Sequence, residues 1–200
     1  MTCWQFRSDG FYELAIEVGS TDDAGLEAVL RAVWDAAGVQ GCYGHGDREP
    51  EEQEAVPCTV ASLEEFGHLR GRVRLPSGDL VVCGVMAVRG GDEISDDSDD
   101  DSSGDSGDWL DFYVPHGALD AVGAATSDGR PFYRSARIDD WLAGIGIEAF
   151  RKAPFGCAAV GWEVSGCIDA ATPAGELPEK RGVGHLVPRD GVLHYGAAND

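Results

Sequence analysis

The chain has 200 residues, of which 43% are hydrophobic, and its formal net charge at pH 7 is -21. This length and hydrophobic content are enough to bury a sizeable core, which excludes disorder of the whole chain. A surface of this charge repels phosphate backbones and anionic lipid, so nucleic acid and membranes are poor candidate partners, whereas a basic protein or a cation is favoured.

The sequence also predicts a cytoplasmic protein. No window approaches the roughly eighteen consecutive apolar residues of a transmembrane span. The first ten residues lack the basic and apolar regions of a secretory signal. Six cysteines are scattered along the chain, and in a reducing compartment we expect them as buried thiols rather than disulfides.

The first half opens with the alternation of a half-buried strand. Over residues 11–18 every second residue is apolar, and Glu13 and Glu17 are expected on the opposite side. Residues 2–7 are a candidate partner strand, joined through a turn at residues 8–10.

An amphipathic helix is predicted next. Apolar residues recur at i, i+3, i+4, i+7, i+8 and i+11 from Leu26 to Ala37, and Gly38 follows where a C-terminal glycine is expected. Ser20 or Thr21 is the expected N-cap.

A short strand within residues 39–46 and a polar loop lead to a second, short helix. The S-x-x-E pattern from Ser62 to Glu65 predicts a capping box at its start, and Gly67 ends it. Residues 69–75 and 80–88 then form a predicted hairpin, and its second arm is apolar on both faces, which is typical of a central strand.

The first arm of that hairpin carries the only concentrated positive charge in the chain. Arg70, Arg72 and Arg74 alternate with apolar residues and project from one face, roughly 6.6 to 6.8 Å apart. Such a row of guanidinium groups, called the arginine ladder below, can bind a carboxylate or phosphate through pairs of hydrogen bonds. The alternative is cross-strand pairing with Glu13 and Glu17, or simple solvation.

Residues 90–108 are strongly acidic. Nine carboxylates lie between Asp92 and Asp108 with no basic residue among them, which predicts a disordered acidic linker or loop. A calcium loop starting at Asp99 would require glutamate where Leu110 stands. The run therefore divides the chain into a first half, residues 1–89, and a second half, residues 109–200, which we expect to pack as one globular unit.

The second half repeats the order of elements in the first. Its predicted strand, short helical segment, long helix, strand and C-terminal hairpin fall at residues 109–114, 116–122, 137–152, 157–164 and 184–195. We therefore predict an α+β fold with a mixed or antiparallel sheet and two main helices. The order also suggests a pseudo-repeat of strand-helix-strand-hairpin units, although a single sheet with both helices on one face needs no repeat.

Motifs for chemistry are sparse. The sequence holds no H-E-x-x-H, C-x-x-C or G-x-S-x-G pattern, and no cofactor or metal is predicted. Cys42 and His45, with Asp47 nearby, could form a metal site or a nucleophile and its base. A small hydrolase or transferase would then have its pocket between the two halves, near Cys42, His45 and His116.

Three stretches carry a resemblance: WLDFYVPHGAL at residues 109–119, IDDWLAGIG at residues 138–146 and VGWEVSG at residues 160–166. They resemble a group of small uncharacterised actinobacterial proteins, with the acidic run as an insertion. The resemblance implies a folded module and carries no activity or catalytic residue.

The sequence thus favours a non-catalytic protein-interaction module that binds a basic partner, in the manner of an immunity or inhibitor protein. The alternative is the small hydrolase or transferase described above. An interaction protein needs a complementary surface, whereas an enzyme needs a pocket that gathers its catalytic groups.

Overall fold

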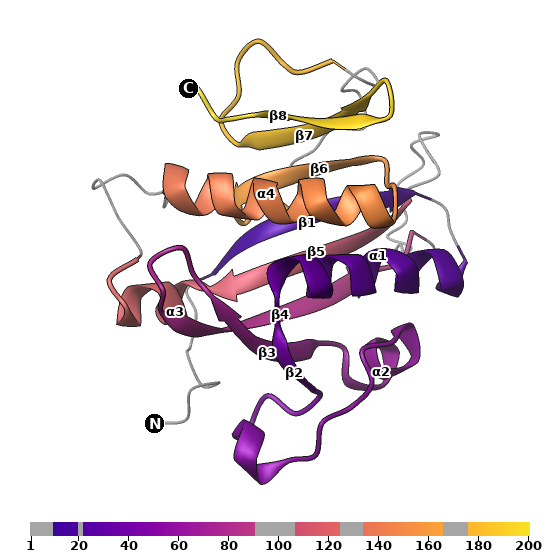
Figure 1. The fold of residues 1–200 in the computed structure, drawn as a ribbon, viewed down its shortest axis with the longest axis vertical. Helices are drawn as coiled ribbons and strands as arrows, with labels where there is room; N and C mark the ends of the chain where they lie inside the picture. The colour runs from indigo at the N-terminus through magenta and orange to yellow at the C-terminus, as the bar shows by residue number, and fades with distance from the viewer. Residues whose placement is uncertain (1–9, 20–21, 91–106, 125–133, 166–175) are drawn as a thin grey trace, which may run out of the picture.

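The computed structural model describes residues 10–19, 22–90, 107–124, 134–165 and 176–200. In these residues, two long helices lie side by side across one face of an eight-stranded sheet (Figure 1). The predicted α+β class is confirmed, and every neighbouring pair of strands is antiparallel. No helix in this part of the chain is long and apolar enough to cross a membrane.

The strands follow the order β2-β3-β4-β5-β1-β6-β7-β8 across the sheet. Their bounds are β1 Phe11–Gly19, β2 Gln40–Tyr43, β3 Leu69–Arg74, β4 Leu80–Val88, β5 Asp108–Pro115, β6 Cys157–Trp162, β7 Gly184–Arg189 and β8 Val192–Gly196. The helices are α1 Asp23–Ala37, α2 Val60–Phe66, α3 His116–Ala121 and α4 Ala136–Lys152, with a 3-10 turn, η1, at Pro50–Glu52. The predicted partner strand at residues 2–7 lies outside the described residues.

The helix starts differ from the predicted caps. Helix α1 is capped by Asp22, whose carboxylate accepts a hydrogen bond from the amide of Gly25 at 2.8 Å. Helix α2 begins two residues before Ser62, and Thr59 Oγ1 accepts from the Ser62 amide. Several side chains at each start can accept from a free amide, so the sequence locates a helix more securely than its cap.

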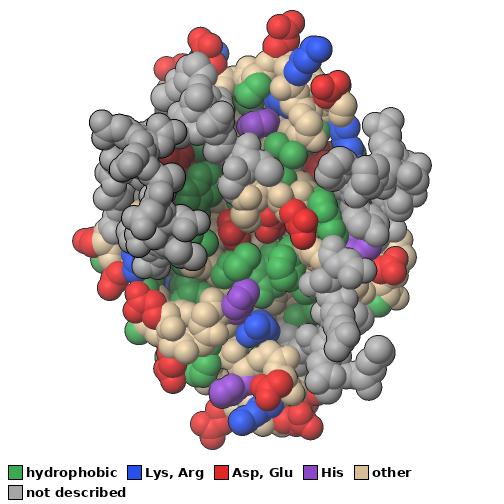
Figure 2. Space-filling view, turned by 180° about the vertical axis from the view of Figure 1, so that it is seen from behind, with side chains coloured by type: hydrophobic (Ala, Val, Ile, Leu, Met, Phe, Trp, Pro, Cys, Tyr) green, Lys and Arg blue, Asp and Glu red, His purple; other side chains and the backbone are tan. Residues whose placement is uncertain are grey.

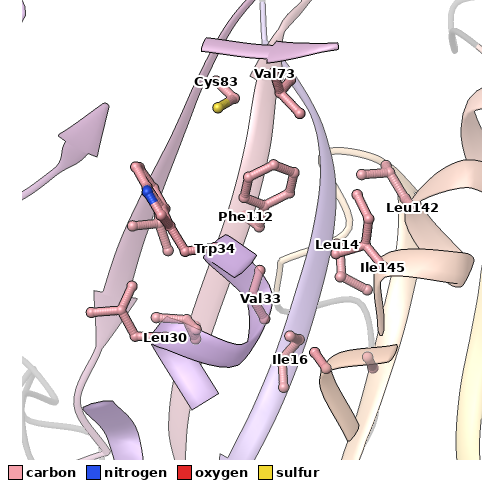
Figure 3. Close-up of a cluster of buried hydrophobic side chains, with 14 of the residues drawn as sticks. Leu14, Ile16, Leu30, Val33, Trp34, Val73, Cys83, Phe112, Leu142 and Ile145 are labelled. Carbon is pink, nitrogen blue, oxygen red and sulfur yellow. The ribbon is translucent and has the colours of Figure 1, made fainter. Parts of the chain in front are cut away.

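The main core lies between the sheet and the two long helices. Leu14 and Ile16 of β1, together with Phe112 of β5, are fully buried against side chains of α1 and α4 (Figure 3). Leu142 and Ile145 represent α4 in this cluster. The apolar residues whose periodicity predicted both helices are therefore the residues that pack against the sheet.

Strands from both halves of the chain form this one sheet. Strand β1 pairs with β5 on one side and with β6 on the other, so an N-terminal strand lies between two strands of the second half. Each half does run strand, helix, strand, hairpin, with α2 inserted in the first. The placement differs, because β2 is at an outer edge whereas its counterpart β6 is next to β1, and a pseudo-repeat is not confirmed.

The two ends of the acidic run lie next to each other. Strands β4 and β5 are adjacent, with Val88 opposite Trp109, and the Gly90 amide donates to Asp108 Oδ1 at 3.1 Å. Arg89 contacts Asp108 Oδ2 at 2.9 Å. The run therefore leaves and rejoins the fold at one place, between neighbouring strands of a hairpin.

Candidate functional site

The sheet face opposite α1 and α4, called the open face below, carries side chains that a two-residue period places there. On β1 these are Phe11, Glu13, Ala15 and Glu17, and on β5 they are Trp109, Asp111 and Tyr113. Figure 2 looks onto this side of the molecule and shows acidic side chains near its centre, next to hydrophobic ones.

Two carboxylates on the open face are buried. Glu13 and Asp111 are each only 2% exposed. In the pairing of β1 with β5, Glu13 is opposite Tyr113 and Ala15 is opposite Asp111, so the two acids are diagonal neighbours. The prediction that β1 is only half-buried is wrong at Glu13, because the open face of β1 is also buried around Glu13 and Ala15.

A serine links the two carboxyl groups. Ser165 follows β6 and is exposed, and its Oγ lies 2.7 Å from Glu13 Oε1 and 3.0 Å from Asp111 Oδ2. The Ser165 amide also donates to Glu13 Oε1 at 2.8 Å. The preceding Glu163 has a φ of 44°, a left-handed conformation that is uncommon outside glycine. This turn fixes Ser165 directly over the pair.

Burial shifts the protonation of both acids. Loss of solvent, and next the charge of Glu13, raise the pKa of Asp111 to about 7, although the hydrogen bond from Ser165 acts in the opposite direction. Burial also raises the pKa of Glu13, although hydrogen bonds from Ser165 and Val164 lower it in part. The pair consequently holds a proton close to neutral pH.

No basic side chain of the described residues forms an ion pair with Glu13 or Asp111. Asp111 Oδ1 is buried and has no hydrogen-bond partner in the described part of the chain. A buried, ionised carboxylate without a counter-charge costs several kcal/mol. Such an arrangement favours a proton or an external cation at this position.

Apolar and aromatic groups border the pair. A small second cluster on the open face consists of Ala15, Ala159 and Val164, with Trp109, Cys157 and Val183 packed against it. On the other side, the rings of Phe11 and Tyr113 lie 4.5 Å apart between centroids. His68 Nδ1 lies 2.9 Å from the Tyr113 hydroxyl, and burial lowers the pKa of His68.

The arginine ladder is held by contacts within the chain. Arg70 donates to the carbonyl of Gly44, Arg72 contacts Glu51, and Arg74 donates to the carbonyl of Gly78. The alternative of pairing with Glu13 and Glu17 is wrong, because β4 and β5 separate β3 from β1. Whether the ladder binds an anion stays a prediction.

Cys42, His45 and His116 do not come together. Cys42 is on the edge strand β2, and the His45 ring packs against Phe66. His116 begins α3 at the end of β5, and its ring packs on Trp162. Strand β5 is the third strand from β2 in the sheet, which separates the two strands by about 14 Å. The structure therefore does not assemble the pocket of the predicted hydrolase or transferase from these residues.

Cys42 has a different neighbour. Its thiol shares a hydrogen bond with Cys58, and this bond together with burial raises the pKa of Cys58. Both are free thiols, as are Cys83 and Cys157. Within the described residues, no group of three or more His, Cys, Asp or Glu side chains is arranged to hold a metal ion.

The sequence did not single out Glu13, Asp111 or Ser165 as site residues. A signal was present, because an acid that interrupts an apolar strand such as residues 109–114 is uncommon. Both faces of this strand are largely apolar, which is typical of a central strand and predicts that its acid is buried. Only the pairing of β1 with β5 brings the two acids together.

Comparison of the chain with family models, curated proteins and solved structures returns no match.

Proposed function

We propose that the protein is a non-catalytic interaction module that binds a basic protein partner through the open face of its sheet, in the manner of an immunity or inhibitor protein. A lysine or arginine of the partner would approach the centre of this face, where Ser165 lies over Glu13 and Asp111.

One observation carries the proposal: two buried carboxyl groups lie side by side, and no basic side chain of the described residues neutralises them. An incoming cation would supply the missing charge in a site from which water is largely excluded. Electrostatic attraction there is stronger than at the surface, so a few groups can contribute much of the specificity.

The overall charge supports the same partner. The chain carries 36 acids and 15 Lys and Arg residues. Several of the described arginines are engaged within the chain: Arg31 with Glu27, Arg72 with Glu51 and Arg151 with Glu148. The resulting negative field would speed the approach of a basic protein and weaken as salt increases.

A cytoplasmic location fits the free thiols of Cys42, Cys58, Cys83 and Cys157, because reduced cysteines are the norm in reducing compartments. This location is part of the proposal.

The proposal can be tested with an oligolysine peptide as the probe, measured by calorimetry at low and moderate salt. The test variant is Glu13→Gln/Asp111→Asn, which keeps the shape of both side chains and removes both ionisable carboxyl groups. We expect it to bind at least about tenfold more weakly than the wild type, equivalent to about 1.4 kcal/mol.

The matched control is Glu54→Gln/Glu65→Gln, which removes two charges from exposed positions outside the open-face pair. We expect its affinity to stay within about threefold of the wild type, since exposed charges are screened. Equal loss in both double variants would show that only net charge matters and would contradict binding at the open face.

One observation favours an enzyme as the second candidate. The exposed Ser165 hydroxyl lies within hydrogen-bond distance of Glu13, as a nucleophile lies beside its base. A fluorophosphonate probe tests this alternative: labelling of the wild type that is lost in Ser165→Ala would support a hydrolase. Absence of labelling in the intact, folded protein would contradict a serine nucleophile of this kind.

A further inference from the structure

The hydrogen-bond geometry at the pair defines where a proton is held. The Ser165 hydroxyl has one hydrogen, yet its oxygen is within hydrogen-bond distance of both Glu13 and Asp111. With both acids ionised, one of these contacts would join two oxygens without a hydrogen between them. With Asp111 protonated, a continuous chain forms in which Asp111 donates to Ser165 and Ser165 donates to Glu13.

Glu13 is the better position for the negative charge. Its Oε1 also accepts a hydrogen bond from the Ser165 amide at 2.8 Å. Among the described residues, Asp111 has only Ser165 as a partner, and its Oδ1 has none. The proton on Asp111 therefore occupies a position where a hydrogen-bond donor can bind. A second acceptor, Asp111 Oδ1, lies at the same position and has no partner among the described residues.

We propose that Glu13, Asp111 and Ser165 form a binding site for one primary alkylammonium group, such as that of a lysine side chain, and that this group enters in exchange for the proton on Asp111. The inference rests on the proposed function, because it names the chemical group by which the basic partner is held. The exchange balances charge: one cation enters and one proton leaves to solvent.

The number of donors favours a primary ammonium. Its three N–H groups match three acceptors from different residues, namely the two carboxylates and the Ser165 oxygen. An alkyl stem can lie against the neighbouring apolar cluster that includes Ala15 and Val164. Because Ser165 is exposed and covers two buried acids, its side chain has to turn for the ammonium to enter.

Among the described residues, few charged and titratable groups lie around Asp111. Strand β1 contributes Glu13, and the turn after β6 contributes Glu163, which raises the pKa of Glu13. On β5 itself the nearest titratable group of this face is Tyr113, which contacts His68 and lies near Arg70. Strand β4 presents Gly84 and Met86, which do not titrate.

The experiment uses n-butylammonium as the probe and the full-length protein, with calorimetry in two buffers of different ionisation enthalpy. We expect about one proton released per cation bound near pH 6. Since the pKa of Asp111 is about 7, apparent affinity should rise about tenfold from pH 6 to pH 8 while proton release falls towards zero. Tetramethylammonium, which has no N–H donor, should bind at least about tenfold more weakly.

Asp111→Asn should abolish proton release, and Glu65→Gln should behave as the wild type. The inference is overturned if n-butylammonium does not bind at its highest usable concentration, if it binds without releasing a proton near pH 6, or if Asp111→Asn releases the same proton. The wild-type result decides the matter even if a variant does not fold. If n-butylammonium binds and oligolysine does not, only the proposed basic partner is contradicted. If oligolysine binds and n-butylammonium does not, only the ammonium site is contradicted.

Discussion

At the scale of the residue, Asp111 determines the chemistry of the open face. Its carboxyl group is 2% exposed, lies beside Glu13 and has one oxygen without a partner in the described residues. Residues placed at a cost to stability are expected where function requires them. The cost at Asp111 can be measured, because it depends on pH.

We predict that the stability difference between the wild type and Asp111→Asn changes with pH. Burial raises the pKa of Asp111 from 3.8 to about 7, so between these values the folded state binds a proton that the unfolded state does not. Raising the pH through this window therefore destabilises the folded wild type. From about pH 5 to about pH 8 it should lose about 3 kcal/mol relative to Asp111→Asn, measured by urea unfolding.

The exposed Asp79 provides a control for this titration. Asp79→Asn should show a difference from the wild type that is nearly constant over the same range. A constant difference for Asp111→Asn as well would mean that Asp111 titrates normally in the folded protein.

The pair also shows how far sequence reasoning reaches for a site. The strand that carries Glu13 was predicted from its alternation, and the strand that carries Asp111 was predicted from its apolar and aromatic residues. What could not be predicted is that these two strands are neighbours, since about one hundred residues separate them. The open face is a product of this long-range pairing, whereas motifs such as that of Cys42 and His45 are local.

At the scale of the element, a buried hydrogen bond joins β1 to the start of α4. The Tyr12 hydroxyl donates to Asp139 Oδ1 at 2.5 Å and accepts from the Ser135 amide at 2.9 Å. Asp139 is buried, and burial raises its pKa while the Tyr12 hydrogen bond lowers it.

We predict that Tyr12→Phe destabilises the protein by about 2 kcal/mol, since it leaves a buried carboxylate and a helix-start amide without their partner. The measurement is urea unfolding at neutral pH. The control is Asp140→Asn at the adjacent, exposed position, which should change stability by less than about 0.5 kcal/mol. If Tyr12→Phe changes stability as little as Asp140→Asn does, the structural role assigned to Tyr12 is contradicted.

Elements were easier to predict than their ends. The phase of apolar residues located α1 and α4 because their spacing is that of the buried face on the sheet. The caps at Asp22 and Thr59 depend on the path of the chain before the first turn, which local patterns leave open.

At the scale of the whole molecule, the fold is organised around β1 and β5, which bring both halves into one sheet. The acidic run begins and ends beside this pairing, where Arg89 and Gly90 meet Asp108. Because β4 and β5 are neighbouring strands, the two ends of the acidic run are already close together, and the fold does not need the length of the run to connect them.

We therefore predict that residues 91–106 can be replaced by a short Gly-Ser loop without loss of the fold. Each halving of loop length changes the closure entropy by only about 0.6 kcal/mol, so unfolding stability should stay within about 2 kcal/mol of the wild type. Circular dichroism and urea unfolding measure this. Loss of folded structure would show that the acidic run itself stabilises the sheet.

The central claim is that Asp111 holds a proton near neutral pH and gives it up to a cation. Its most direct test is a titration of the Asp and Glu side-chain carboxyl carbons by NMR, with and without n-butylammonium, using Asp111→Asn to assign the signal. We predict that Asp111 titrates near its pKa of about 7 in the free protein and at clearly lower pH when the ammonium is present. An Asp111 carboxyl that titrates at its ordinary value, or that does not respond to n-butylammonium, would contradict the account.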